Sequence, residues 1–150
     1  MDVSKLDARE LVELCEGADC WHTRAVPRLG LHPLMMADGP HGLRKQEEKE
    51  RQNNVSLVST CYPTASALAC SWDVTAAERL GRAVAKEAWN ADVAVLLGPG
   101  INMKRSPLCG RNFEYFSEDP FLAGRLGAAY VSAAQGEDVA VSLKHFAANN

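Results

Sequence analysis

The sequence has no long apolar run, no Cys-x-x-Cys pair and no excess of basic residues. A membrane-spanning helix needs about 20 consecutive apolar residues, and no stretch of the chain approaches that length. The 16 lysines and arginines stand against 19 aspartates and glutamates, which gives a formal net charge of -3. This mildly acidic balance excludes a general binder of nucleic acid or of anionic membranes. We expect neither as a partner.

The start of the chain also lacks the features of a secretory signal. Residues 1–7 contain neither a basic segment nor an apolar one, and both are needed for export by this route. We therefore expect a cytoplasmic protein. Because 47% of the residues are hydrophobic and 23% are charged, the composition is that of a folded globular domain rather than a disordered chain.

The five cysteines are odd in number and have no zinc-type spacing with histidine. A disulfide framework is typical of small domains with little core, and this chain is rich in apolar residues. We expect buried free thiols and no metal site. The residues concerned are Cys15, Cys20, Cys61, Cys70 and Cys109.

Apolar periodicity and end signals predict three helices and three strands. We expect helices at residues 6–16, 74–90 and from Pro120 to about Gly136, capped by Ser4, Asp73 and Asp119 respectively. Short apolar runs predict buried strands at 34–37, 93–97 and 139–143. The charge run at residues 45–51 is interpreted as a solvated face.

Alternation of buried strands with helices indicates an α/β fold with a parallel sheet and right-handed crossovers. Polar residues follow the carboxyl end of each predicted strand, where such folds place their sites. They are Asp38 after the first strand, residues 102–111 after the second, and Lys144 with His145 after the third. A (β/α)8 barrel needs about 200 residues or more, so we expect 150 residues to form only its beginning.

Each polar group has a chemical and a structural interpretation. Asp38 can accept hydrogen bonds from ligand hydroxyls with Arg44 nearby, or it can simply cap a turn beside a solvated arginine. Arg111 can grip two hydroxyls or a carboxylate, or it can pin its loop through an ion pair with Glu114 or Asp119.

Lys144 and His145 are adjacent on a strand end, so both face a ligand only if the strand twists there. The alternative for His145 is a packed, hydrogen-bonded histidine, and it has no neighbouring residue in the sequence that would make it a metal ligand. Residues 98–100 suggest a nucleotide loop, but Met103 occupies the position of the third glycine in that motif.

Taken together, these motifs resemble the start of the catalytic domain of glycoside hydrolase family 3, which contains β-glucosidases and related exo-glycosidases. The matching stretches follow the family order and cover nearly the whole chain. They are Trp21–Thr23, Met36–Arg44, Pro63–Ala65, Leu97–Asn102, Cys109–Pro120 and Lys144–Asn150.

The resemblance implies that residues 1–150 are the N-terminal portion of a TIM-like (β/α)8 barrel, about three β/α units long. It also implies that the residues of the motifs bind the terminal sugar of a β-linked oligosaccharide or glucoside, without a cofactor or metal. These residues would be Asp38, Arg44, Arg111, Lys144 and His145.

Enzymes of this family retain the anomeric configuration and use an Asp nucleophile and a Glu acid/base. In the family both lie downstream of the Lys-His motif, so we assign neither here and expect them beyond residue 150. The leading hypothesis is therefore the sugar-binding part of an exo-acting β-glucosidase that is inactive alone. The apolar edge at 139–143 predicts poor independent folding.

Two alternatives remain at this point. A non-catalytic sugar-binding module would retain these contacts without the reaction. A phosphate- or nucleotide-binding domain would instead use Arg105, Arg111 and Lys144.

Overall fold

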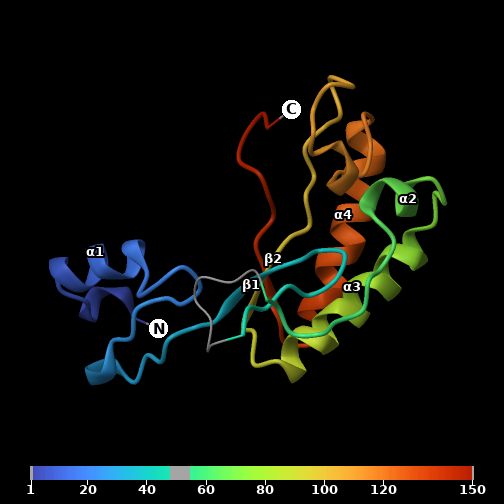
Figure 1. Cartoon of the computed structure of the whole chain (residues 1–150). Helices are drawn as coiled ribbons and strands as arrows, with labels where there is room; N and C mark the ends of the chain where they lie inside the picture. The colour runs from blue at the N-terminus through green and yellow to red at the C-terminus, as the bar shows by residue number, and fades with distance from the viewer. Residues whose placement is uncertain (1, 48–54, 150) are drawn as a thin grey trace. The chain divides into compact units, whose positions relative to one another are not determined.

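The computed structural model of the chain describes residues 2–47 and 55–149 (Figure 1). It contains two compact units, residues 1–36 and 37–150. None of the helices in the described ranges has the length and apolar character needed to span a bilayer.

The first unit contains the helix α1 (Ala8–Glu16) between two short 3-10 helices, η1 (Val3–Lys5) and η2 (Pro27–Leu29). The predicted cap at Ser4 is wrong, because Ser4 lies inside η1. Asp7 caps α1 instead: its carboxylate accepts the Glu10 backbone N–H at 2.8 Å, and the Glu10 carboxylate accepts that of Asp7 at 2.9 Å. This reciprocal arrangement satisfies two N–H groups that the helix leaves unpaired.

The second unit carries a three-stranded sheet in the order β1-β2-β3, formed by β1 (Met36–Asp38), β2 (Val95–Leu97) and β3 (Ala140–Val141). Strands β2 and β3 are parallel, with Val95 opposite Ala140 and Leu96 opposite Val141. The predicted α/β class with parallel pairing is thus confirmed. The strands are shorter than the apolar runs that predicted them, although Val93 and Val139 remain buried just outside them.

Two long helices, α3 (Val74–Asn90) and α4 (Pro120–Gln135), lie side by side (Figure 1). Both begin at the predicted aspartate caps, because the Asp73 carboxylate accepts the Thr75 N–H and that of Asp119 accepts the Phe121 N–H. Burying their small apolar faces against each other supplies a large part of the core of this unit. Its members include Ala77, Leu80, Val84, Ala88, Leu126, Tyr130, Ala133 and Ala134.

The sequence did not predict helix α2 (Ala65–Ala69) or the 3-10 helix η3 (Asn112–Glu114). Both are too short to produce a detectable apolar period. A local signal for α2 was present, however, since the Thr64 hydroxyl accepts the Ala67 N–H and caps the helix.

Two predictions about exposed and buried residues need correction. The cysteines are free, as expected, but none is buried: Cys15, Cys20, Cys61 and Cys70 are exposed and Cys109 is partly so. In the charge run, Lys45 is half-buried, because its ammonium donates to the Ala91 carbonyl at 2.6 Å, beyond the end of α3. Residues 48–51 of that run lie outside the described residues.

Candidate functional site

The segments that follow β2 and β3 leave the sheet in the same direction (Figure 1). Gly100, just after β2, forms parallel bridges with both Lys144 and Tyr115. A side chain at position 100 would place its Cβ 2.9 Å from the Tyr115 ring, so glycine permits this close approach. The bridges bring three segments, distant in the sequence, to one edge of the sheet.

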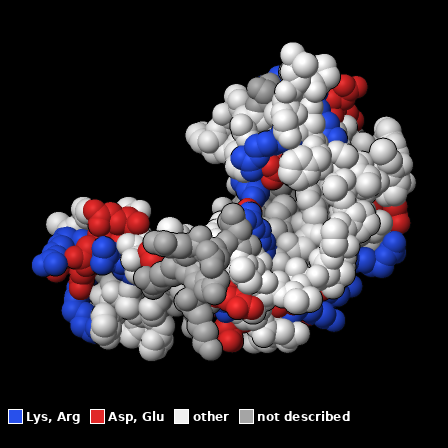
Figure 2. All heavy atoms as spheres, viewed as in Figure 1, with Lys and Arg blue, Asp and Glu red and all other residues white. Residues whose placement is uncertain are grey.

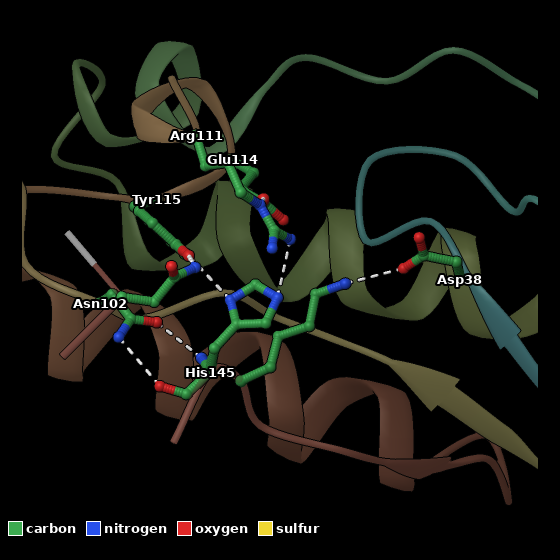
Figure 3. Close-up of polar contacts among 8 residues, drawn as sticks. Asp38, Asn102, Arg111, Glu114, Tyr115 and His145 are labelled. Carbon is green, nitrogen blue, oxygen red and sulfur yellow. Dashed lines mark hydrogen bonds and ion pairs between the residues drawn. The ribbon is translucent and has the colours of Figure 1, made fainter. Parts of the chain in front are cut away.

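Asp38 and Lys144 form an ion pair at that edge, with 2.7 Å between Oδ1 and Nζ (Figure 3). Burial alone would raise the pKa of Asp38. The hydrogen bond and charge of Lys144, together with the Gly39 N–H and the charge of Arg44, outweigh it and lower that pKa. Asp38 is therefore a carboxylate at neutral pH, and its oxygens have lone pairs that can accept further hydrogen bonds.

A tight turn connects Asp38 to Arg44. The Arg44 N–H donates to the Asp38 carbonyl at 2.8 Å. Gly39 has φ +107°, and a Cβ there would lie 1.9 Å from the Gly42 carbonyl oxygen. Glycine is therefore required at position 39, and the turn fixes Arg44 beside Asp38.

Arg111 is held from two directions (Figure 3). Its Nε donates to the carboxylate of Glu114, which is only 6% exposed. Its Nη2 lies 2.7 Å from Nε2 of His145. Of the two ion pairs considered from the sequence, the structure forms the one with Glu114, whereas Asp119 caps α4.

His145 is fixed by its backbone and by both ring nitrogens. Its N–H donates to Asn102 Oδ1 at 2.6 Å, and Asn102 Nδ2 donates to its carbonyl at 2.9 Å. The ring Nδ1 lies 2.8 Å from the Tyr115 hydroxyl. Burial and then the positive charge of Arg111 lower the pKa of His145, so the ring is neutral at pH 7.

A cleft of about 620 Å³ adjoins this cluster. One part of its lining is charged, and comprises Asp38, Arg44, Arg111 and Glu114. The rest includes a neutral stretch, formed by Ser56, Leu57, Ser59, Thr60 and Cys61. A smaller hollow of about 280 Å³ lies along Asn102, Arg105, Lys144 and His145. Basic and acidic groups lie beside one another on this hollowed face (Figure 2).

The structure brings the five predicted site residues together, Lys144 toward Asp38 and His145 toward Arg111. Three further residues join this group without having been predicted as its partners, namely Asn102, Tyr115 and Asn149. Each lies in a stretch whose length or polarity indicated binding, but no local pattern singles out one residue. Their roles arise from contacts over 30 to 43 positions of the chain.

The arrangement alternates acceptors and donors around a cleft of several hundred cubic ångströms. A carboxylate, an ammonium and a guanidinium together can hydrogen-bond neighbouring hydroxyl groups, which both donate and accept. Among the described residues, no group of three His, Cys, Asp or Glu side chains is placed to hold a metal ion. The chemistry therefore favours a polyhydroxylated ligand.

Comparison with known proteins agrees with this chemistry. The chain is 52% identical over 150 residues to the thermostable β-glucosidase B of Acetivibrio thermocellus, covering 99% of this chain and 20% of that protein. It is 45% identical over 151 residues to an exo-α-(1→6)-L-arabinopyranosidase of Bifidobacterium longum, again covering 99% of this chain and 20% of the relative. The chain thus spans about a fifth of the length of these relatives.

Solved structures give the same result. A β-glucosidase of Bifidobacterium adolescentis superposes with a TM-score of 0.87 at 44% identity, covering 99% of this chain and 21% of that one. The β-glucosidase 3B of Thermotoga neapolitana in complex with glucose superposes with a TM-score of 0.86 at 37% identity, covering 98% and 22%. The family model for the glycosyl hydrolase family 3 N-terminal domain matches residues 34–150. The chain therefore belongs to glycoside hydrolase family 3.

Proposed function

We propose that this chain binds the terminal non-reducing β-D-glucosyl residue, or a similar sugar, of a β-linked substrate for a retaining glycosidase. The observation that carries the proposal is the position of the paired charges beside one cleft, Asp38 with Lys144 and Arg111 with Glu114. The relatives named β-glucosidase and the neighbour in complex with glucose support this substrate class.

Each residue has a definite part in this proposal. The second oxygen of Asp38 accepts from sugar hydroxyls, and Lys144 and Arg111 donate the N–H groups not used in their ion pairs. Arg44 adds positive charge beside Asp38. His145 differs, because both its ring nitrogens already have protein partners, and we propose that it acts on the sugar by orienting Arg111.

We further propose that the three β/α units are the start of a (β/α)8 barrel. The sequential strand order and the parallel pairing of β2 with β3 support this architecture. The site also lies at the carboxyl ends of the strands, as it does in such barrels. We assign no nucleophile or acid/base among these 150 residues, and cytoplasmic localisation stays a prediction.

Titration calorimetry with glucose and, separately, with ATP tests the binding. We expect glucose to bind and Asp38→Asn to weaken it at least tenfold, because a charged acceptor contributes about 1.5–3 kcal/mol. Arg79→Lys serves as the control, because Arg79 is exposed and is not among the residues that line the cleft. Binding of ATP without glucose, or an unchanged affinity in Asp38→Asn, would overturn the proposal.

The catalytic part is tested by assaying purified residues 1–150 with an aryl β-glucoside. We expect no turnover, because the proposal places neither reacting carboxylate within these residues. Measurable hydrolysis would contradict that assignment. Glucose binding without turnover by the complete natural gene product would instead favour the non-catalytic sugar-binding module.

A further inference from the structure

The hydrogen bonds around His145 determine which of its ring nitrogens carries the proton. Arg111 Nη2 lies 2.7 Å from His145 Nε2, and a guanidinium only donates hydrogen bonds. Nε2 must therefore present its lone pair to Arg111. A neutral imidazole has one proton, which then resides on Nδ1.

The proton on Nδ1 has a partner within reach, the hydroxyl of Tyr115 at 2.8 Å. The same hydroxyl accepts from Asn149 Nδ2 at 2.6 Å. The Tyr115 ring meets the imidazole edge-on, with centroids 5.8 Å apart and planes at 76°. Tyr115 is fully buried as a residue and is bridged to Gly100, so its hydroxyl is held in place.

We propose that Tyr115 is a positioning residue: it accepts from the Nδ1–H of His145, holds the ring against Arg111 and thereby keeps Arg111 directed at the cleft. Glu114 holds the Nε of Arg111 and His145 holds its Nη2. The remaining N–H groups of the guanidinium are then presented with little freedom to rotate. Restricting them in advance lowers the entropy lost when a ligand binds.

The opposite arrangements conflict with the geometry. A proton on Nε2 would face an N–H of Arg111, and a doubly protonated ring would place two positive groups 2.7 Å apart. The other charged groups around the ring are Lys144, Glu114 and Asp38, of which the last two are acidic. Among the neutral groups, Asn102 hydrogen-bonds to the backbone N–H and carbonyl of His145.

The tautomer can be measured directly in the wild-type protein. The protein is expressed from its natural gene with 15N-labelled histidine, and the 15N signals of the ring nitrogens are recorded at pH 8. We expect a protonated Nδ1 and an unprotonated Nε2 for His145. The signals of His145 are identified by their loss in His145→Gln. A proton on Nε2 of His145 in the wild type would overturn the proposal.

Tyr115→Phe then tests the positioning role. Without an acceptor for Nδ1–H, the ring loses the contact that holds it against Arg111, so we expect the Nε2–H form to become populated. Glucose affinity should fall by about fivefold, which corresponds to one lost hydrogen bond. Tyr130→Phe removes the same kind of atom from a bond to the Pro40 carbonyl and should leave the signals of His145 unchanged. An unaltered tautomer in Tyr115→Phe would overturn the positioning role.

The glucose measurement rests on the proposed function, whereas the tautomer measurement does not. If the wild type has the Nδ1–H form and Tyr115→Phe loses it, yet neither protein binds glucose, the proposed function fails and the positioning role of Tyr115 stands. His41 supplies an internal reference. Its Nε2 accepts the Ala65 N–H at 2.9 Å, so its Nδ1–H form should persist in Tyr115→Phe.

Discussion

Helices α3 and α4 contact each other through small apolar residues, whereas the loop from 102 to 115 is held by polar side chains. Between the helices the backbones approach closely: a Cβ on Gly81 would lie 2.4 Å from the Tyr130 carbonyl oxygen. In the loop, Ser66 Oγ lies within hydrogen-bond distance of the carbonyls of Asn112, Phe113 and Tyr115.

The helix pair depends on the shapes of its packed side chains, whereas the loop depends on the directions of its hydrogen bonds. Packing between helices depends on how well volumes fit and is insensitive to pH. A hydrogen-bonded loop depends on individual atoms, and its charged members respond to protonation. The helix pair should therefore be damaged by added volume, and the site loop by the removal of single polar atoms.

The largest expected effect is that of Gly81→Ala in α3. The new methyl group would overlap the backbone of α4, which cannot move as a side chain can. Overpacking of this kind costs about 3 kcal/mol of unfolding free energy, measurable by urea denaturation. Gly124→Ala in α4 is the matched control, because no atom of the described residues lies within 4 Å of its Cβ, and it should gain up to about 1 kcal/mol. Equal effects at both positions would refute the close contact.

Ser66→Ala should have the next largest effect, since the hydroxyl donates its one proton among the carbonyls of the 112–115 stretch and also accepts from Lys104. Leaving such part-buried groups without their partner costs about 1–2 kcal/mol. The same urea experiment measures it. Ser132→Ala, at an exposed position of α4, should stay within about 0.5 kcal/mol of wild type. A neutral Ser66→Ala would show that the loop does not depend on this atom.

The difference between the helix pair and the loop also explains which features could be predicted from the sequence. Helices α3 and α4, with their caps at Asp73 and Asp119, follow from local periodicity and from side chains that bond to nearby backbone. Asp38 and Lys144 were predictable as site residues because parallel strands bring their carboxyl ends to one edge. Their actual contact, 106 positions apart in the chain, required the fold.

Other features had no local signal. The contact between Tyr115 and His145 depends on how the loop from 102 to 115 packs beside Gly100. The exposure of the cysteines depends on which faces other segments cover, and thiol chemistry alone favours burial. Asp7 rather than Ser4 caps α1, and because both residue types cap helices, the sequence pattern alone does not choose between them.

The contribution of Asp38 to the stability of the protein should depend on pH. The pKa of Asp38 is lower in the folded protein than its ordinary value, so its contribution to stability is present above pH about 4 and is lost as the pH falls through the folded value. Because the side chain is 38% exposed, we expect less than about 1 kcal/mol.

Urea unfolding between pH 3 and 7 measures the contribution of Asp38 to the free energy of unfolding. The curves of wild type and Asp38→Asn should differ most at pH 7 and converge toward pH 3, whereas Gly81→Ala should lie below wild type by a constant amount. A constant gap for Asp38→Asn would mean that its effect is one of packing rather than charge.

Glu87 belongs to both regions, because it is a residue of α3 whose side chain hydrogen-bonds to the segment that lines the cleft. Its carboxylate accepts the Tyr62 hydroxyl at 2.7 Å and the Thr60 N–H at 3.2 Å, and Thr60 lines the cleft. Burial alone would raise the pKa of Glu87, but the bonds from Thr60 and Tyr62 lower it. Their stabilising contribution is therefore present above pH about 4.3 and lost as the pH falls through the folded value.

Glu87→Gln should cost only about 0.5 kcal/mol at pH 7, because the amide keeps one acceptor oxygen and the site is partly solvated. Its effect on glucose affinity, measured by the same calorimetry, should be larger than that of Glu78→Gln, which changes an exposed residue of the same helix. If both variants bind glucose equally well, the cleft lining at Thr60 is not held by α3, and the helix pair serves stability alone.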